Sequence, residues 1–113
     1  MLLKTDLLYL QQMSMTAVNS VKMKFICPAI GEDHEKDFLV SGSLEDFKII
    51  AFSNMDEYEK GYEYLKLSDY KPCEVSIDLF KNLAENDTEF SGIILNIHSE
   101  KKIISKAELK QLP

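Results

Sequence analysis

The alternation of apolar and polar residues predicts several strands. Residues 21–27 alternate in this way, which is typical of a half-buried strand. Residues 47–52 are almost continuously apolar, as in a central strand that is buried on both faces. Residues 92–97 give the strongest strand signal, and a turn at residues 99–100 leads to an expected antiparallel partner at 102–104. Further short strands are predicted at residues 38–40 and 72–77.

Apolar residues at helical spacing predict four helices, over about residues 5–20, 55–65, 79–84 and 106–112. Capping signals of the form [ST]-x-x-[DE] precede two of them, at Ser53 with Asp56 and at Ser105 with Glu108. Gly61 lies inside the second helix, where it costs about 1 kcal/mol relative to Ala. We therefore expect tertiary contacts to support that helix.

The order of elements from residue 47 onward is strand, helix, strand, helix, strand. Right-handed crossovers then make these three strands parallel neighbours or near-neighbours, and the other strands add antiparallel pairs. We expect a single domain over residues 1–113, of the α+β or α/β class. It has an N-terminal helix at about 5–20 and a core of about 21–112, in which helices pack on a mixed, partly parallel sheet. Pro28 is expected at a strand end or an edge, and residues 41–43 at a turn.

Four segments together resemble the N-terminal domain of the SseB family, the enhanced serine sensitivity proteins of bacteria. They are IIAFSNMDEY at residues 49–58, the helix with Leu79, Phe80 and Leu83, GIILNI at 92–97 and IISKAEL at 103–109. The resemblance covers about residues 25–112 and implies a fold and a bacterial cytoplasmic setting, without a catalytic mechanism. The family pattern has Pro after Asn96, where this chain has Ile97, so the following turn is expected to differ. We expect no counterpart of the family's usual C-terminal domain within these 113 residues.

Charge narrows the classes of partner. All 13 basic residues are Lys, and the net charge is −6. Because base recognition and phosphate binding favour Arg and clustered positive charge, we expect no nucleic-acid partner. An acidic protein can instead attract a basic protein partner, or its charge can serve only to keep it in solution. No apolar run reaches the length of a membrane span, so we expect no membrane partner.

Cysteine and histidine spacing gives no sign of a metal or cofactor. Cys27 and Cys73 are far apart, and neither His34 nor His98 has another His or a Cys three or four residues away. We expect two reduced thiols in a cytoplasmic protein, the alternative being one disulfide in an exported chain. Charged and polar residues interrupt the apolar N-terminal stretch, which argues against a signal peptide. Nucleophile-elbow, P-loop and dinucleotide motifs are absent, so we expect no cofactor and no enzymatic activity.

Two groups of residues are candidates for a binding site. Open parallel sheets bind ligands beyond the carboxyl ends of their strands, which here carry Ser53-Asn54, residues 77–78, and Asn96 with His98. The alternative is structural: Ser53 caps its helix, Asn96 bonds the turn and His98 is solvated. The second candidate is an interface built from Tyr58 and Tyr62, with Tyr64, Tyr70 and the acidic residues Glu57, Glu59 and Glu63 nearby.

The leading functional hypothesis is a non-enzymatic protein-binding or regulatory module, whose partner is another protein or a second copy of the chain. In that case His98 should be exposed on its turn. One alternative is a small enzyme, in which His98 should face a pocket, with a carboxylate or carbonyl orienting its ring and Ser53 within reach. A second alternative, argued from charge alone, is an acidic neutraliser of a basic protein toxin.

Overall fold

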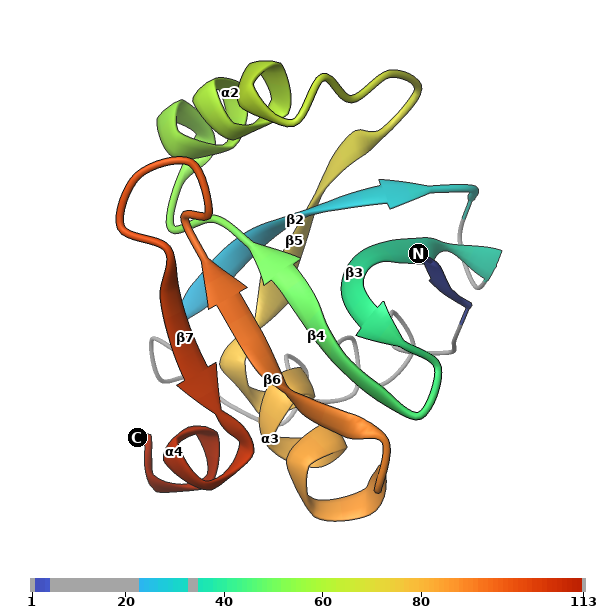
Figure 1. Cartoon of the computed structure of the whole chain (residues 1–113), viewed down its shortest axis with the longest axis vertical. Coiled ribbons are helices and arrows are strands. Elements are labelled where there is room, and N and C mark those ends of the chain that lie inside the picture. The colour runs from blue at the N-terminus through green and yellow to red at the C-terminus, as the bar shows by residue number, and fades with distance from the viewer. Residues whose placement is uncertain (1, 5–22, 33–34, 113) are drawn as a thin grey trace.

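A curved, mixed β-sheet forms the body of the molecule (Figure 1). The computed structural model describes residues 2–4, 23–32 and 35–112. The sheet order is β5-β2-β3-β4-β6-β7, and β1 pairs with β3. Among the described strands only the β4–β6 pair is parallel, and the other pairs are antiparallel. The strands are β1 (Leu2–Lys4), β2 (Lys24–Ile30), β3 (Asp37–Ser43), β4 (Asp46–Ala51), β5 (Lys71–Ser76), β6 (Phe90–Leu95) and β7 (Lys102–Ser105).

Within the described ranges three helices pack against this sheet, which confirms the predicted mixed, partly parallel sheet with helices on it. They are α2 (Met55–Tyr64), α3 (Ile77–Asn86) and α4 (Lys106–Gln111). As predicted, β4 and β6 are interior strands and β7 is the antiparallel partner of β6. β6 ends at Leu95, so Ile97 lies beyond the strand. The helix predicted over about residues 5–20 lies outside the described residues.

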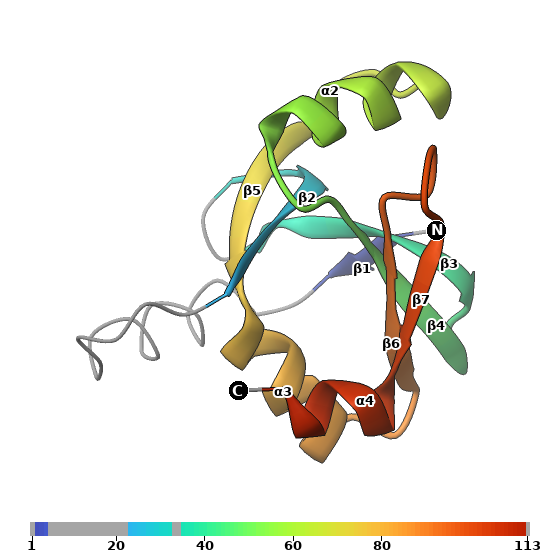
Figure 2. The ribbon, with the colours of Figure 1, turned by 90° about the vertical axis from the view of Figure 1, so that its left-hand side faces the viewer.

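Alternating side chains of the strands build two apolar clusters on opposite sides of the sheet. Ile49 and Ala51 of β4 join the larger cluster, whereas Ile50 and the following Phe52 join the smaller one. The larger cluster includes residues of α3 and α4, and the smaller one includes Tyr58 of α2. Figure 2 accordingly shows α2 on one side of the sheet and α3 with α4 on the other.

The predicted position of the strand at residues 72–77 was wrong. β5 is not a parallel neighbour of β4 or β6; it pairs antiparallel with β2 at the far end of the sheet. Its residues alternate between buried and exposed, with Cys73 and Val75 inside and Glu74 outside. This alternation is typical of an antiparallel strand with one open face, whereas a parallel interior strand would be apolar throughout.

Pro28 was also wrongly placed, because it lies inside β2, which has neighbours on both sides. It faces Pro72 of β5 across the strand pair. Neither proline nitrogen carries a hydrogen, so this pair falls at a position where β2 and β5 exchange no hydrogen bonds. On the other side of β2, Pro28 lies between the Ile26–Phe52 bridge and the Ala29–Phe38 pair, and so it interrupts neither.

The turn predicted at residues 41–43 falls one step later, because these residues belong to β3. β3 and β4 are joined through Leu44 and Glu45, with Ser43 opposite Asp46. Gly42 has a φ of +111°, and a Cβ there would lie 2.4 Å from the Asp46 carbonyl oxygen. Glycine is therefore required just before the turn rather than in it.

The start of α2 differs from the prediction by one residue. Asn54, not Ser53, is the N-cap, and its Oδ1 accepts a hydrogen bond of 2.9 Å from the Glu57 amide. Gly61 packs directly on Phe52: a Cβ at this position would lie 2.1 Å from Cε1 of the ring. The intrinsic cost of glycine is therefore offset by a close approach of helix and sheet. The predicted capping box of Ser105 and Glu108 is confirmed at the start of α4.

Candidate functional site

The parallel pairing of β4 and β6 brings Ser53 and Asn96 together, as the sequence predicted. The Asn96 side chain is buried, with 1% exposed. Its Oδ1 accepts a 3.1 Å hydrogen bond from the Ser53 amide, and its Nδ2 donates to Ser53 Oγ at 3.1 Å and to Glu100 Oε1 at 3.0 Å. Asn96 thus ties the ends of both strands and the next turn together.

The backbone of Asn96 also organises that turn. Its φ is +52°, a left-handed conformation that asparagine tolerates better than most residues. Its amide donates to the Ala51 carbonyl at 3.0 Å, and its carbonyl accepts from the amides of Ser99 and Lys101, each at 2.9 Å. Of the structural alternative, the part that placed Asn96 in the turn is therefore confirmed, whereas Asn54 and not Ser53 caps the helix.

His98 is not the exposed turn residue that the binding hypothesis predicted, because only 8% of its side chain is exposed. Its ring lies 5.7 Å from the Phe52 ring, centroid to centroid. Nε2 is 3.6 Å from Glu57 Oε1, and neither ring nitrogen has a hydrogen-bond partner among the described residues. Glu57 Oε1 instead accepts from Ser99 Oγ at 3.2 Å. The orienting hydrogen bond that the enzyme hypothesis requires is therefore not formed either.

The third strand end proposed for the crevice does not reach it. Ile77 and Asp78 follow β5, which is paired with β2 at the opposite edge from β6 and β7. Ser76 caps α3 there by accepting from the Asp78 amide at 3.2 Å. The predicted crevice is thus reduced to the ends of β4 and β6.

The two predicted tyrosines line a different feature, a hollow of about 260 Å³ between α2 and β5. We call it the tyrosine groove; its lining residues are Tyr58, Glu59, Tyr62, Tyr70 and Pro72. The rings of Tyr58 and Tyr62 are 5.8 Å apart at an angle of 47°. Tyr64, which the sequence grouped with them, is 62% exposed and is not among these lining residues.

Tyr58 has an unusual environment in this groove. Its hydroxyl is buried and has no hydrogen-bond partner among the residues described. Burial, followed by the proximity of Tyr62 and Cys27, raises the pKa of Tyr58 to about 12. The hydroxyl is therefore a neutral donor at ordinary pH.

Sequence reasoning missed Pro72 as a lining residue, because its strand was assigned to the sheet interior. The available signal was a proline within an alternating strand, which favours an edge. The edge position of β5 leaves Pro72 exposed beside α2, where it completes one wall of the tyrosine groove.

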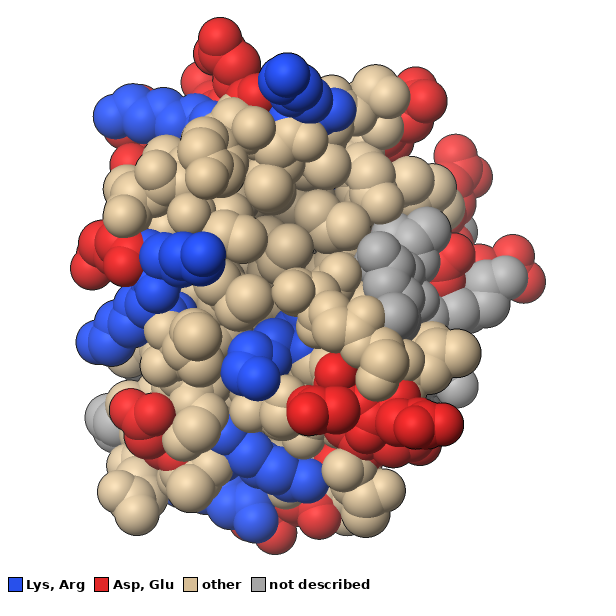
Figure 3. All heavy atoms as spheres, viewed as in Figure 1, with Lys and Arg blue, Asp and Glu red and all other residues tan. Residues whose placement is uncertain are grey.

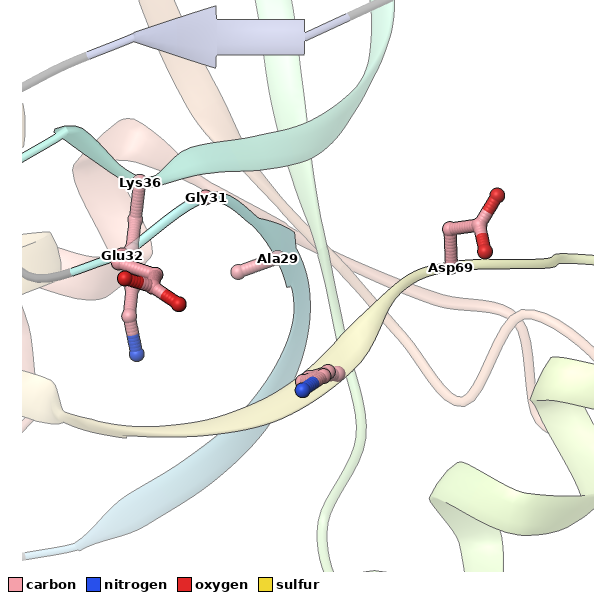
Figure 4. Close-up of a pocket in the computed structure, with 6 residues that line it drawn as sticks. Ala29, Gly31, Glu32, Lys36 and Asp69 are labelled. Carbon is pink, nitrogen blue, oxygen red and sulfur yellow. The ribbon is translucent and has the colours of Figure 1, made fainter.

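A second hollow, of about 430 Å³, lies at the same end of the β2–β5 pair, where Ala29 is opposite Lys71 (Figure 4). Its lining includes two lysines and two carboxylates, so its charge is balanced: Ala29, Gly31, Glu32, Lys36, Asp69 and Lys71. Figure 4 shows Lys36 and Glu32 together on one side, while the Asp69 carboxylate points away from them. The Lys36 ammonium lies 4.0 Å from Cys73 Sγ.

The rest of the described surface has few features. On the face shown in Figure 3, acidic and basic side chains lie in small separate groups. No set of three or more His, Cys, Asp and Glu residues in the described ranges could hold a metal ion. No described helix is long and apolar enough to cross a membrane.

Comparison with protein-family models, curated proteins and solved structures gave no match. The resemblance to the SseB family therefore stays a prediction from the sequence.

Proposed function

We propose that this chain is a non-enzymatic protein-binding module, and that the tyrosine groove receives a basic segment of a partner protein. The observation that carries the proposal is the lining of the groove, which consists of three tyrosines, a proline and one acidic residue, Glu59. Tyrosine combines a large contact area with a polar tip and is favoured at protein interfaces.

The charge around the groove favours a cationic occupant. α2 contains four acidic residues and one basic residue. The basic residue is Lys60, whose ammonium pairs with the Asp56 carboxylate at 3.1 Å, and the other acidic residues are Glu57, Glu59 and Glu63. A lysine or arginine side chain of the partner could lie against the faces of Tyr62 and Tyr70 near Glu59, and this cation–π contact contributes about 0.5–1 kcal/mol at an exposed site. The net charge of −6 adds long-range attraction to a basic partner.

The polar residues at the ends of β4 and β6 support a binding role over catalysis. The side chains of Ser53, Asn54 and Asn96 form hydrogen bonds to other groups of the chain that stabilise the fold. His98 lacks the hydrogen-bonded carboxylate that would orient a general base. The SseB resemblance adds a bacterial cytoplasmic setting to the proposal.

The test uses short unstructured peptides that differ only in their charged residue: lysine, arginine, serine or glutamate. Backbone NMR shifts of the full chain should move with the lysine and arginine peptides, around residues 58–62 and 70–72. Tyr62→Ala should weaken this binding about fivefold, as the loss of one cation–π contact predicts. Added salt should weaken it further.

Tyr64→Ala is the matched control, since Tyr64 is a tyrosine of the same helix outside the groove lining. It should bind the basic peptides as the wild type does. Equal binding of the glutamate peptide, or shifts confined to another surface, would contradict the proposal.

A further inference from the structure

The two cysteines of the chain, distant in sequence, lie directly opposite each other in the β2–β5 pair. Since the adjacent Pro28–Pro72 pair exchanges no hydrogen bonds, Cys27 and Cys73 occupy the hydrogen-bonded position, where Cα atoms are about 5.5 Å apart. Opposite residues of an antiparallel pair project on the same face of the sheet. Disulfides span Cα separations of about 4.4–6.8 Å, and this spacing lies within that range. They also need Cβ atoms about 3.5–4.5 Å apart, closer than the roughly 5.5 Å of a hydrogen-bonded pair, so the two side chains must draw together when the bond forms.

The two thiols differ in their surroundings. Both are free and lie in the larger apolar cluster, with Cys27 0% and Cys73 5% exposed. Burial raises the pKa of both, and the nearby Lys36 ammonium opposes this effect only at Cys73. Lys36 both lines the 430 Å³ hollow and holds its ammonium 4.0 Å from Cys73 Sγ. Of the two thiols, Cys73 is therefore the one that loses its proton and meets a reagent more readily, because it lies beside a cation and is the less deeply buried.

We propose that Cys27 and Cys73 form a thiol–disulfide exchange site that reacts with small-molecule disulfides such as oxidised glutathione. The Cys73 thiolate attacks one sulfur of the reagent, which breaks the reagent's disulfide bond and releases one thiolate. The Cys27 thiolate then attacks the Cys73 sulfur of the mixed disulfide and releases the second thiolate. The two protons of the protein thiols go to the two released thiolates, so the protein pair is oxidised by two electrons and the reagent is reduced by two.

The product is a cross-link that ties the edge strand β5 to β2. It forms without a change of sheet register, because the two residues are already paired. In the unfolded chain the same two thiols are separated by a long flexible loop, so their effective concentration is far lower. The fold itself should therefore favour the oxidised pair.

The experiment equilibrates the purified full chain with mixtures of reduced and oxidised glutathione, in buffer and in denaturing urea. Samples are quenched with acid, and the oxidised fraction is measured by intact mass after alkylation. We expect an internal disulfide, with an equilibrium constant at least about tenfold higher for the folded than for the unfolded chain. A peptide map of the folded sample should join the segments that contain Cys27 and Cys73.

Cys27→Ser and Cys73→Ser are the matched variants. The Cys27→Ser chain should stop at the mixed disulfide with glutathione on Cys73, whereas the Cys73→Ser chain should react much more slowly. If either variant fails to fold, the comparison of the folded and unfolded wild type still decides. Disulfides only between chains, thiols that stay alkylatable at high oxidised glutathione, or an equal equilibrium constant in urea would overturn the proposal.

Discussion

At the scale of single residues, Tyr58 and Asn96 behave in opposite ways. Asn96 is buried, and each polar atom of its side chain is hydrogen-bonded. Tyr58 buries a hydroxyl that has no partner in the described part of the chain. A buried polar group without a partner costs about 1–3 kcal/mol, so Tyr58 is kept at the expense of stability. Such an expense is typical of a residue that serves binding.

Tyr58→Phe should therefore leave the fold intact and raise the free energy of unfolding by about 1 kcal/mol at neutral pH. The wild type should also lose stability as the pH rises from 10 to about 12. In that window the unfolded chain has released the Tyr58 proton and the folded chain still holds it, so unfolding becomes more favourable. Urea unfolding across this range should show a shallower decline for Tyr58→Phe than for Tyr64→Phe. A destabilised Tyr58→Phe at neutral pH would indicate that the hydroxyl does have a partner.

At the scale of elements, two neighbouring polar residues have different roles at the N-terminus of α2: Asn54 caps the helix, and Ser53 bonds Asn96. Asn54→Ala removes the cap that binds the Glu57 amide and should cost about 1 kcal/mol of unfolding free energy. Asn54→Asp keeps the acceptor and should be close to wild type. Ser53→Ala should cost less than Asn54→Ala, since its hydroxyl lies outside the helix cap. Thermal or urea unfolding of the three variants measures the order, and a larger loss for Ser53→Ala would restore the cap predicted from the sequence.

The elements that could be predicted from the sequence are those whose signals are local. β4 and β6 carry long apolar runs, and α4 has a complete capping box. The cap of α2 was misplaced because Ser53 and Asn54 are both good caps, and Ser53 is engaged elsewhere, its amide donating to Asn96 Oδ1. The partner of β5 was missed because strand pairing is set by contacts with β2, far away in sequence.

At the scale of the whole molecule, the candidate site was predicted in part. The meeting of Ser53 and Asn96 followed from parallel strands, which the β4–β6 pair supplies. The burial of His98 could not be read from its polar turn sequence, because it depends on Phe52 and on α2 lying over the same side of the sheet. The tyrosine groove likewise needs the edge position of β5, which brings Tyr70 and Pro72 to Tyr58 and Tyr62.

The pairing of Pro72 with Pro28 has a consequence for protein aggregation. In the described part of the sheet β5 is an end strand, and the imide nitrogen of Pro72 faces outward, because its pair with Pro28 exchanges no hydrogen bonds. An incoming strand of another molecule would meet a position that offers no donor, which discourages edge-to-edge growth of fibrils. Pro72→Thr restores the donor and should speed the rise of thioflavin fluorescence on prolonged incubation, whereas Pro28→Thr, inside the sheet, should not. If both variants aggregate as slowly as the wild type, other groups protect this edge, and the role of Pro72 is limited to lining the tyrosine groove.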